Sequence, residues 1–181
     1  MSDHESDFTE HTLTSKTVYK GGLLHVLEDE VRIPDGKSAR REYIRHPGAV
    51  AMLPMLDRET VVLIRQYRYP PRRHFYEIPA GKIDAGEEPL AAAQRELREE
   101  TGYAAASWRS LAVLDPCIGY SDERIELFLA QDLTRVGAAL DEGEFLEEVP
   151  LALKVALDWV KSGRITDVKT IVGLLWVAKL L

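Results

Sequence analysis

The sequence has a single cysteine, no long apolar run and fewer basic than acidic residues. An intrachain disulfide needs two cysteines, so we interpret Cys117 as a small packing residue. No apolar stretch approaches the ~18 residues that a membrane span needs. The 23 Lys and Arg against 30 Asp and Glu give a formal net charge of −7. This balance argues against a nucleic-acid backbone as the main partner, because such binding depends on Lys and Arg.

The first ten residues are polar and acidic and lack the apolar segment of a secretory signal. We therefore expect a cytoplasmic protein with no membrane partner. A length of 181 residues with 45% hydrophobic residues suits one core, or one core with a small appendage.

Three regions are expected along the chain. Residues 1–14 are polar and predict a flexible tail. Residues 15–45 predict two or three antiparallel strands, with Pro34-Asp35-Gly36 as the turn before a strand over Ser38–Arg45. Residues 46–181 predict the main domain. Its expected strands cover 49–56, 60–67, 75–79, 111–114 and 125–131, and its expected helices cover 89–101, 150–162 and 168–180.

The helix over 89–101 carries the clearest chemical pattern. Pro89 suits its first position and Gly102 its C-terminal cap. Glu96, Glu99 and Glu100 then share one face, where like charges repel. A cation between them would remove this cost, and Mg²⁺ and Mn²⁺ prefer such oxygen ligands. A solvated helix with a charge run remains the alternative interpretation.

The same segment carries a resemblance to a known family. Its residues from Gly81 to Tyr103 read GKIDAGEEPLAAAQRELREETGY. They resemble the complete Nudix box at Gly81, Glu87, Arg95-Glu96-Leu97, Glu99-Glu100, Gly102 and Tyr103. The resemblance implies an α+β fold in which a mixed β-sheet is sandwiched between α-helices. It also implies metal-dependent hydrolysis of a nucleoside diphosphate linked to another group.

The flanking segments resemble one branch of this family, the ADP-ribose pyrophosphatases and nucleoside-diphosphate-sugar hydrolases. They read RQYRYP over 65–70, EIPAG over 77–81 and GYSDE over 119–123. The N-terminal β segment over 15–45 is similar to the part of that branch that contacts substrate and helps to form an intertwined homodimer. Ile118 stands where the branch often has proline, which leaves the preferred sugar open.

The resemblance also implies roles for single residues. The metal ligands would be Glu96, Glu100 and the carbonyl of Ala80, with Glu99 as a helper, and the ion would be Mg²⁺ with Mn²⁺ as a substitute. Gly81, Glu87, Arg95 and Gly102 would shape the box, with Glu87 and Arg95 bracing the loop against the helix. The catalytic base would be Glu142 or, as second choice, Glu144. Substrate contacts would come from Arg41, Arg68, Glu77, Gly119 and Glu123. For Glu77 and Glu123, a surface salt bridge remains the alternative.

Hydrolysis of ADP-ribose to AMP and ribose 5-phosphate is therefore the leading hypothesis. A broader nucleoside-diphosphate-sugar hydrolase, acting for example on GDP-mannose, is the close alternative. A non-catalytic ADP-ribose sensor that controls transcription is the alternative from another class. Such a sensor would need a DNA-binding module, and residues 149–181 are expected to be needed to close the core.

Overall fold

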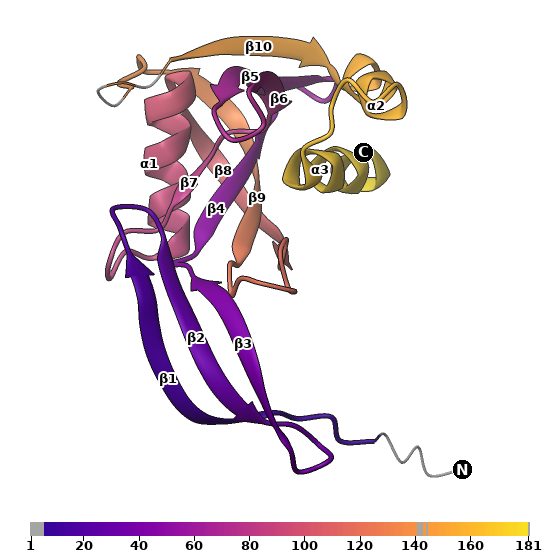
Figure 1. Cartoon of the computed structure of the whole chain (residues 1–181). Helices are drawn as coiled ribbons and strands as arrows, with labels where there is room; N and C mark the ends of the chain where they lie inside the picture. Colours follow the sequence, from indigo (N-terminus) through magenta and orange to yellow (C-terminus); the bar gives the residue numbers. More distant parts are fainter. Residues whose placement is uncertain (1–5, 141–142, 144, 181) are drawn as a thin grey trace. The chain divides into compact units, whose positions relative to one another are not determined.

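The computed structural model describes residues 6–140, 143 and 145–180, and the chain divides into two compact units. The N-terminal unit contains the residues up to His46 together with Cys117–Glu123. The core unit contains Pro47–Pro116 and the residues from Arg124 onward. Figure 1 shows the strands and helices of each unit. No helix in the described part of the chain is long and apolar enough to cross a membrane.

The N-terminal unit contains a three-stranded antiparallel sheet in the order β1-β2-β3. Its strands are β1 (His11–Lys20), β2 (His25–Arg32) and β3 (Ser38–Arg45). The expected antiparallel strands are thus confirmed. The boundary of the expected tail was wrong, because residues 11–14 belong to β1, where His11 pairs with Arg32. Backbone hydrogen bonds form whatever the side chains are, so a polar segment can still join a sheet.

A loop from the middle of the chain completes the N-terminal unit. The backbone N–H of Ile44 donates to the carbonyl of Tyr120, and the N–H of Asp122 donates to the carbonyl of Ile44. The carboxylate of Asp122 also accepts the N–H of His46 at 2.7 Å. Residues 117–123 therefore group with β3, which a division of the sequence at residue 46 did not anticipate.

The core unit contains two sheets. The four-stranded sheet has the order β7-β4-β9-β8, with β4 and β9 parallel and the other pairs antiparallel. The three-stranded sheet has the antiparallel order β10-β5-β6. The strands are β4 (Ala49–Pro54), β5 (Thr60–Arg68), β6 (Arg73–Glu77), β7 (Ala80–Lys82), β8 (Tyr103–Leu114), β9 (Ile125–Arg135) and β10 (Leu146–Ala152).

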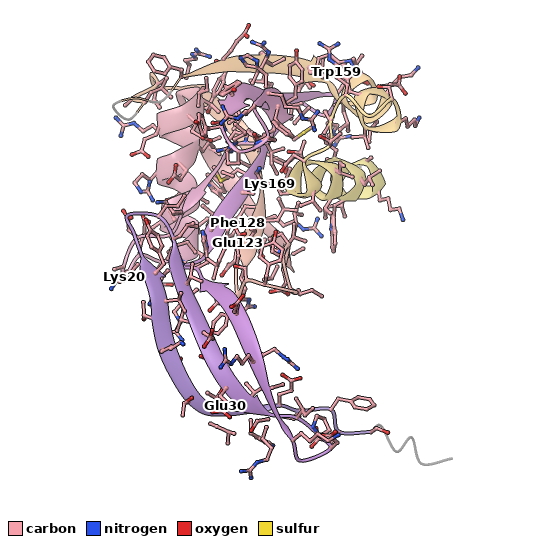
Figure 2. The ribbon with its side chains drawn as sticks, viewed as in Figure 1. Lys20, Glu30, Glu123, Phe128, Trp159 and Lys169 are labelled. Carbon is pink, nitrogen blue, oxygen red and sulfur yellow. The ribbon has the colours of Figure 1, made fainter. Side chains whose placement is uncertain are left out.

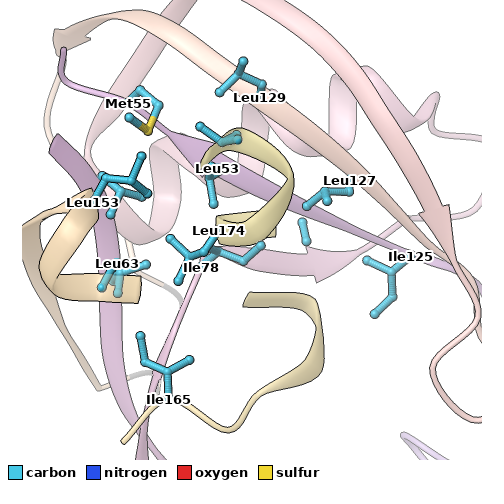
Figure 3. Close-up of a cluster of buried hydrophobic side chains, with 14 of the residues drawn as sticks. Leu53, Met55, Leu63, Ile78, Ile125, Leu127, Leu129, Leu153, Ile165 and Leu174 are labelled. Carbon is cyan, nitrogen blue, oxygen red and sulfur yellow. The ribbon is translucent and has the colours of Figure 1, made fainter. Parts of the chain in front are cut away.

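In the described residues, three helices cover these sheets: α1 (Pro89–Thr101), α2 (Leu153–Lys161) and α3 (Val168–Leu180). The side chains of β4 alternate between two buried clusters, as the two-residue period of a strand requires. Val50 and Met52 pack with α1, whereas Leu53 packs with Leu174 of α3 (Figure 3). The expected α+β fold, with a mixed sheet between helices, is confirmed.

The start of the second helix was predicted wrongly. Pro150 was taken as the first residue of a helix over 150–162, but it lies in β10 opposite Val62, and α2 begins at Leu153. In the described residues β10 is an edge strand of its sheet, where proline is tolerated because one side of the strand needs no ladder bonds. The bounds predicted for α1 and α3 agree with the structure.

Candidate functional site

The C-terminal half of α1 and the start of β7 meet through Glu100. Its side chain is buried, with 7% exposed, although carboxylates rarely lose water without partners. One carboxylate oxygen, Oε2, accepts the backbone N–H of Ala80 at 2.9 Å. The helix thus holds the Ala80 backbone at the place where a carbonyl ligand was expected.

Glu96 approaches the same backbone one residue further along. A Cβ atom added to Gly81 would overlap the carboxylate of Glu96, so a larger residue at this position would force that flexible side chain to move. Glu96 and Glu100 are therefore both brought against the Ala80–Gly81 segment. Glycine at position 81 thus leaves this space to the Glu96 carboxylate.

Arg95 ties the loop before α1 to the helix. Its Nε and Nη2 donate to the two carboxylate oxygens of Glu87 at 3.0 and 2.9 Å. Its Nη1 donates to Glu96 at 2.7 Å and to Glu99 at 3.1 Å, and Nη2 also reaches the carbonyl of Lys82. Hydrogen bonds from Arg95 hold the pKa of the Glu87 carboxyl below its usual range. The structure thus pairs Glu87 with Arg95, as a brace requires.

Gly102 ends α1 and fixes the segment that follows β9. Its φ of 71° lies in the left-handed region, and its N–H donates to the carbonyl of Arg98. The carbonyl of Gly102 accepts the N–H of Val136 at 2.8 Å, and that of Glu99 accepts the N–H of Ala139 at 3.2 Å. The approach to the predicted base is therefore held against the helix. Glu142 and Glu144 themselves lie outside the described residues.

A second ionic cluster lies at the end of β6. Glu77 is 3% exposed and accepts two hydrogen bonds from Arg68, from Nε to Oε1 and from Nη2 to Oε2, each at 2.8 Å. Lys169 of α3, labelled in Figure 2, donates to Oε2 at 2.6 Å. Burial acts to raise the pKa of Glu77, but the hydrogen bonds from Arg68 and the charge of Lys169 outweigh it and lower the pKa.

Sequence reasoning missed Lys169. It lies 92 residues from Glu77, so no local spacing connects the two side chains. One signal was available in the sequence. The helix predicted over 168–180 places Lys169 in the first helical turn, where the helix dipole disfavours positive charge. A lysine there indicates a requirement from outside the helix.

The other predicted substrate residues lie in the N-terminal unit. Arg41 donates to the carboxylate of Glu10 through Nε and Nη2. Glu123 lies 3.9 Å from Nε2 of His46. Arg41 and Gly119 line one hollow of about 260 Å³ together with Tyr43 and Tyr120. Their contact with substrate stays a prediction.

The residues along α1 fit a divalent cation by their chemistry. Two carboxylates, Glu96 and Glu100, converge on the Ala80–Gly81 backbone, and oxygen donors of this kind suit Mg²⁺. Within the described part of the chain, no three His, Cys, Asp or Glu side chains form a ready ligand cluster.

Comparisons with known proteins match both units. Residues 45–161 match the model of the NUDIX domain, and residues 10–44 match that of the nucleoside diphosphate sugar hydrolase N-terminal domain. The chain is 38% identical to the ADP-ribose pyrophosphatase of Bacillus subtilis (strain 168), over 89% of this chain and 88% of that protein. It is 38% identical to the methanol dehydrogenase activator of Bacillus methanolicus, over 92% of this chain and 91% of that protein. A solved structure titled "Crystal structure of ADP compounds hydrolase" superposes with a TM-score of 0.88 at 27% identity, over 98% of this chain and 96% of that one.

Proposed function

The chain belongs to the NUDIX family of hydrolases, and from this premise we propose that it hydrolyses the diphosphate bond of ADP-ribose to AMP and ribose 5-phosphate. The observation that carries the proposal is the convergence of Glu96 and Glu100 on the Ala80–Gly81 backbone. The names of the B. subtilis relative and of the structural neighbour support an ADP-containing substrate.

Members of the family generally use a divalent metal, and we propose Mg²⁺, with Mn²⁺ as a substitute. Glu96, Glu100 and the Ala80 carbonyl would hold it, with Glu99 as a helper. When bound, such an ion neutralises charge on the diphosphate oxygens and lowers the pKa of a bound water. The buried setting of Glu100 suits this role, because a carboxylate with little access to water gains much from a cation.

The chain's own residues would bind the diphosphate and accept a proton from the attacking water. Arg68 and Arg41 supply guanidinium groups, which pair bidentately with phosphate oxygens. Glu142, with Glu144 as second choice, is proposed as the base that accepts the proton. Gly119 and Glu123 are proposed to contact the rest of the substrate. We further propose that the protein is a cytoplasmic homodimer.

A related substrate is the close alternative. The chain is 33% identical to the GDP-mannose pyrophosphatase of Escherichia coli O1:K1 / APEC, over 82% of this chain and 83% of that protein. A guanine nucleotide–sugar therefore competes with ADP-ribose as the preferred substrate. The sensor hypothesis has less support, because residues 146–180 form β10, α2 and α3 of the core unit rather than a separate module.

Hydrolysis of a panel of nucleotide–sugars, with Mg²⁺ and separately with Mn²⁺, tests the proposal. We expect the highest kcat/KM for ADP-ribose, and AMP and ribose 5-phosphate as its products. A higher kcat/KM for GDP-mannose would replace the substrate while leaving the reaction in place. No hydrolysis of any member of the panel with either metal would refute the proposed function.

A further inference from the structure

Lys169 is a buried lysine in the first turn of α3. It is 8% exposed, and its Nζ contacts Glu77 Oε2 at 2.6 Å and Asp167 Oδ1 at 3.1 Å. A positive charge at this end of a helix opposes the dipole, and burying an ammonium group loses its hydration. A lysine here stabilises neither the helix nor the apolar core. Its charge instead stabilises the carboxylates that it contacts.

The more important of these carboxylates is Glu77, because it holds Arg68. Two parallel hydrogen bonds fix the plane of the Arg68 guanidinium against Glu77. They use two of the five N–H donors of the group. The Arg68 side chain stays 43% exposed while Glu77 is 3% exposed. An anion from solvent can therefore reach Arg68, whereas the Glu77 carboxylate is enclosed by its two cations.

We propose that Lys169 is a positioning residue for substrate binding: it holds the carboxylate of Glu77 in place, and Glu77 in turn orients Arg68 for the diphosphate. The proposal rests on the proposed function, in which Arg68 binds the diphosphate. It gives Glu77 a different role from the direct substrate contact expected from sequence. A carboxylate this deeply buried acts on the substrate through Arg68.

A second contact shows that α3 does not need Lys169 merely to dock on β6. Thr170, which is fully buried, accepts the backbone N–H of Ile78 at 2.9 Å and also donates to Asp167. This neutral anchor joins the start of α3 to the residue directly after Glu77. It offers a matched control, because Thr170→Val loosens the same junction without changing the charge around Glu77.

The test measures affinity directly. The ligand is an ADP-ribose analogue in which a methylene group replaces the bridging oxygen of the diphosphate, so that it cannot be hydrolysed. Calorimetric titration in Mg²⁺ should show that Lys169→Met weakens binding of the analogue by about tenfold. This is comparable with the loss of affinity when a residue that orients a metal ligand is removed. Thr170→Val should lower the melting temperature yet bind the analogue as the wild type does. With ADP-ribose itself, Lys169→Met should raise KM more than it lowers kcat.

A double-mutant cycle tests whether Lys169 acts through Glu77. If it does, Lys169→Met combined with Glu77→Gln binds no more weakly than Glu77→Gln alone. If the two substitutions weaken binding additively, or if Lys169→Met binds with wild-type affinity, the inference is wrong. Lys169→Gln, which keeps a polar head group, replaces the methionine variant if that variant does not fold.

The failure of this inference can be told apart from the failure of the proposed function. A wild-type protein that neither binds the analogue nor hydrolyses ADP-ribose refutes the function. A wild-type protein that binds the analogue, beside a folded Lys169 variant that binds it equally well, overturns only the role of Lys169. Lys161→Met, at an exposed lysine of α2 paired only with Asp158 in the described structure, controls for the loss of one positive charge.

Discussion

Glu100 has two roles on one side chain. It accepts a structural hydrogen bond, and it is an expected metal ligand. Its Oε2 accepts the N–H of Ala80, and its position on α1 places it one turn from Glu96. Glutamine at this position keeps a carbonyl oxygen for the Ala80 N–H but removes the negative charge. The fold and the chemistry can therefore be separated by a single substitution.

We predict that Glu100→Gln loses hydrolysis but keeps the fold. The metal-free variant should be at least as stable as the wild type, because the repulsion within the glutamate cluster falls. Circular dichroism and thermal unfolding check the fold, and hydrolysis at saturating Mg²⁺ checks the activity. Glu88→Gln, at an exposed position just before α1, is the control. A wild-type rate in Glu100→Gln at saturating Mg²⁺ would refute the metal assignment.

Glu142 and Glu144 can be distinguished by how their variants fail. Loss of a base acts mainly in the transition state, so Glu142→Gln should lower kcat by ~10²–10⁴-fold with affinity nearly intact. Glu144→Gln should instead raise, modestly, the metal concentration that gives half the maximal rate, and excess metal should restore part of the activity. Metal titrations of both variants with ADP-ribose measure the difference. Near-wild-type kcat in Glu142→Gln would move the base to Glu144 or Glu99.

The lowered pKa of Glu77 predicts that the free energy of unfolding depends on pH. Its pKa is lowered from an ordinary value of 4.5: burial acts to raise it, and Arg68 and Lys169 outweigh burial. A lower pKa in the folded than in the unfolded state means that the ionised form stabilises the fold. This stabilisation is fully present above the unfolded-state pKa, and it is lost as pH falls through the folded-state pKa.

We therefore predict that Glu77→Gln lowers the free energy of unfolding by roughly 3 kcal/mol near neutral pH. This is the lower end for breaking a buried ion pair, chosen because the Arg68 side chain is 43% exposed. The difference from wild type should shrink as the pH falls below 4.5. Urea unfolding at a series of pH values measures it, and a difference that stays constant down to the folded-state pKa would contradict the prediction.

Among the elements, α1 was the easiest to predict and β10 the hardest. Pro89 and Gly102 mark the ends of α1 by local chemistry, since proline fits the first turn and glycine the left-handed cap. Pro150 gave the same local signal for a helix start, but it lies in β10 and pairs with Val62. Tertiary pairing with β5 overrode a signal that was correct at Pro89.

The residues of the site also differ in how far sequence could predict them, because some contacts lie within one segment and others join distant elements. The shared face of the α1 glutamates follows from spacing within one helix, and Gly81 follows from the resemblance of the same segment to the Nudix box, so sequence alone could predict them. The cluster of Glu77, Arg68 and Lys169 joins β5, β6 and α3, and its longest link spans 92 residues. Such contacts depend on how the elements pack, and no periodicity of one element shows them.

Gly102, the C-terminal cap of α1, gives a prediction about this helix as a whole. Gly102 combines a positive φ with close packing, because an added Cβ would lie 2.6 Å from the backbone nitrogen of Ala138. Gly102→Ala should therefore cost more than the ~1 kcal/mol of left-handed strain alone. It should also reduce kcat, because the displaced segment leads to Glu142. Gly36→Ala is the matched control, with φ of 87° but open space around its Cβ, and it should cost only the strain. Equal losses of stability in the two variants would contradict the packing argument.

At the scale of the whole molecule, the exposed strand β1 suggests a surface for association with another chain. All ten residues of β1 are exposed, among them Leu13, Val18 and Tyr19. In the described residues β1 is also an edge strand of its sheet, and an exposed edge strand offers unpaired backbone groups to another chain. A three-stranded sheet is also near the lower limit for independent stability. A second copy of the chain is the partner that the family resemblance implies.

We predict a homodimer in which residues 15–45 pack against the partner. Sedimentation equilibrium of the wild type at micromolar concentration should give twice the mass of one chain. Val18→Asp should shift the population toward the monomer, because a carboxylate buried in an apolar interface without a partner loses its hydration. Ser110→Asp adds the same charge at an exposed position of β8, outside the N-terminal unit, and should leave the dimer intact. A wild-type monomer at this concentration would refute the homodimer, and an unchanged dimer in Val18→Asp would remove β1 from the interface.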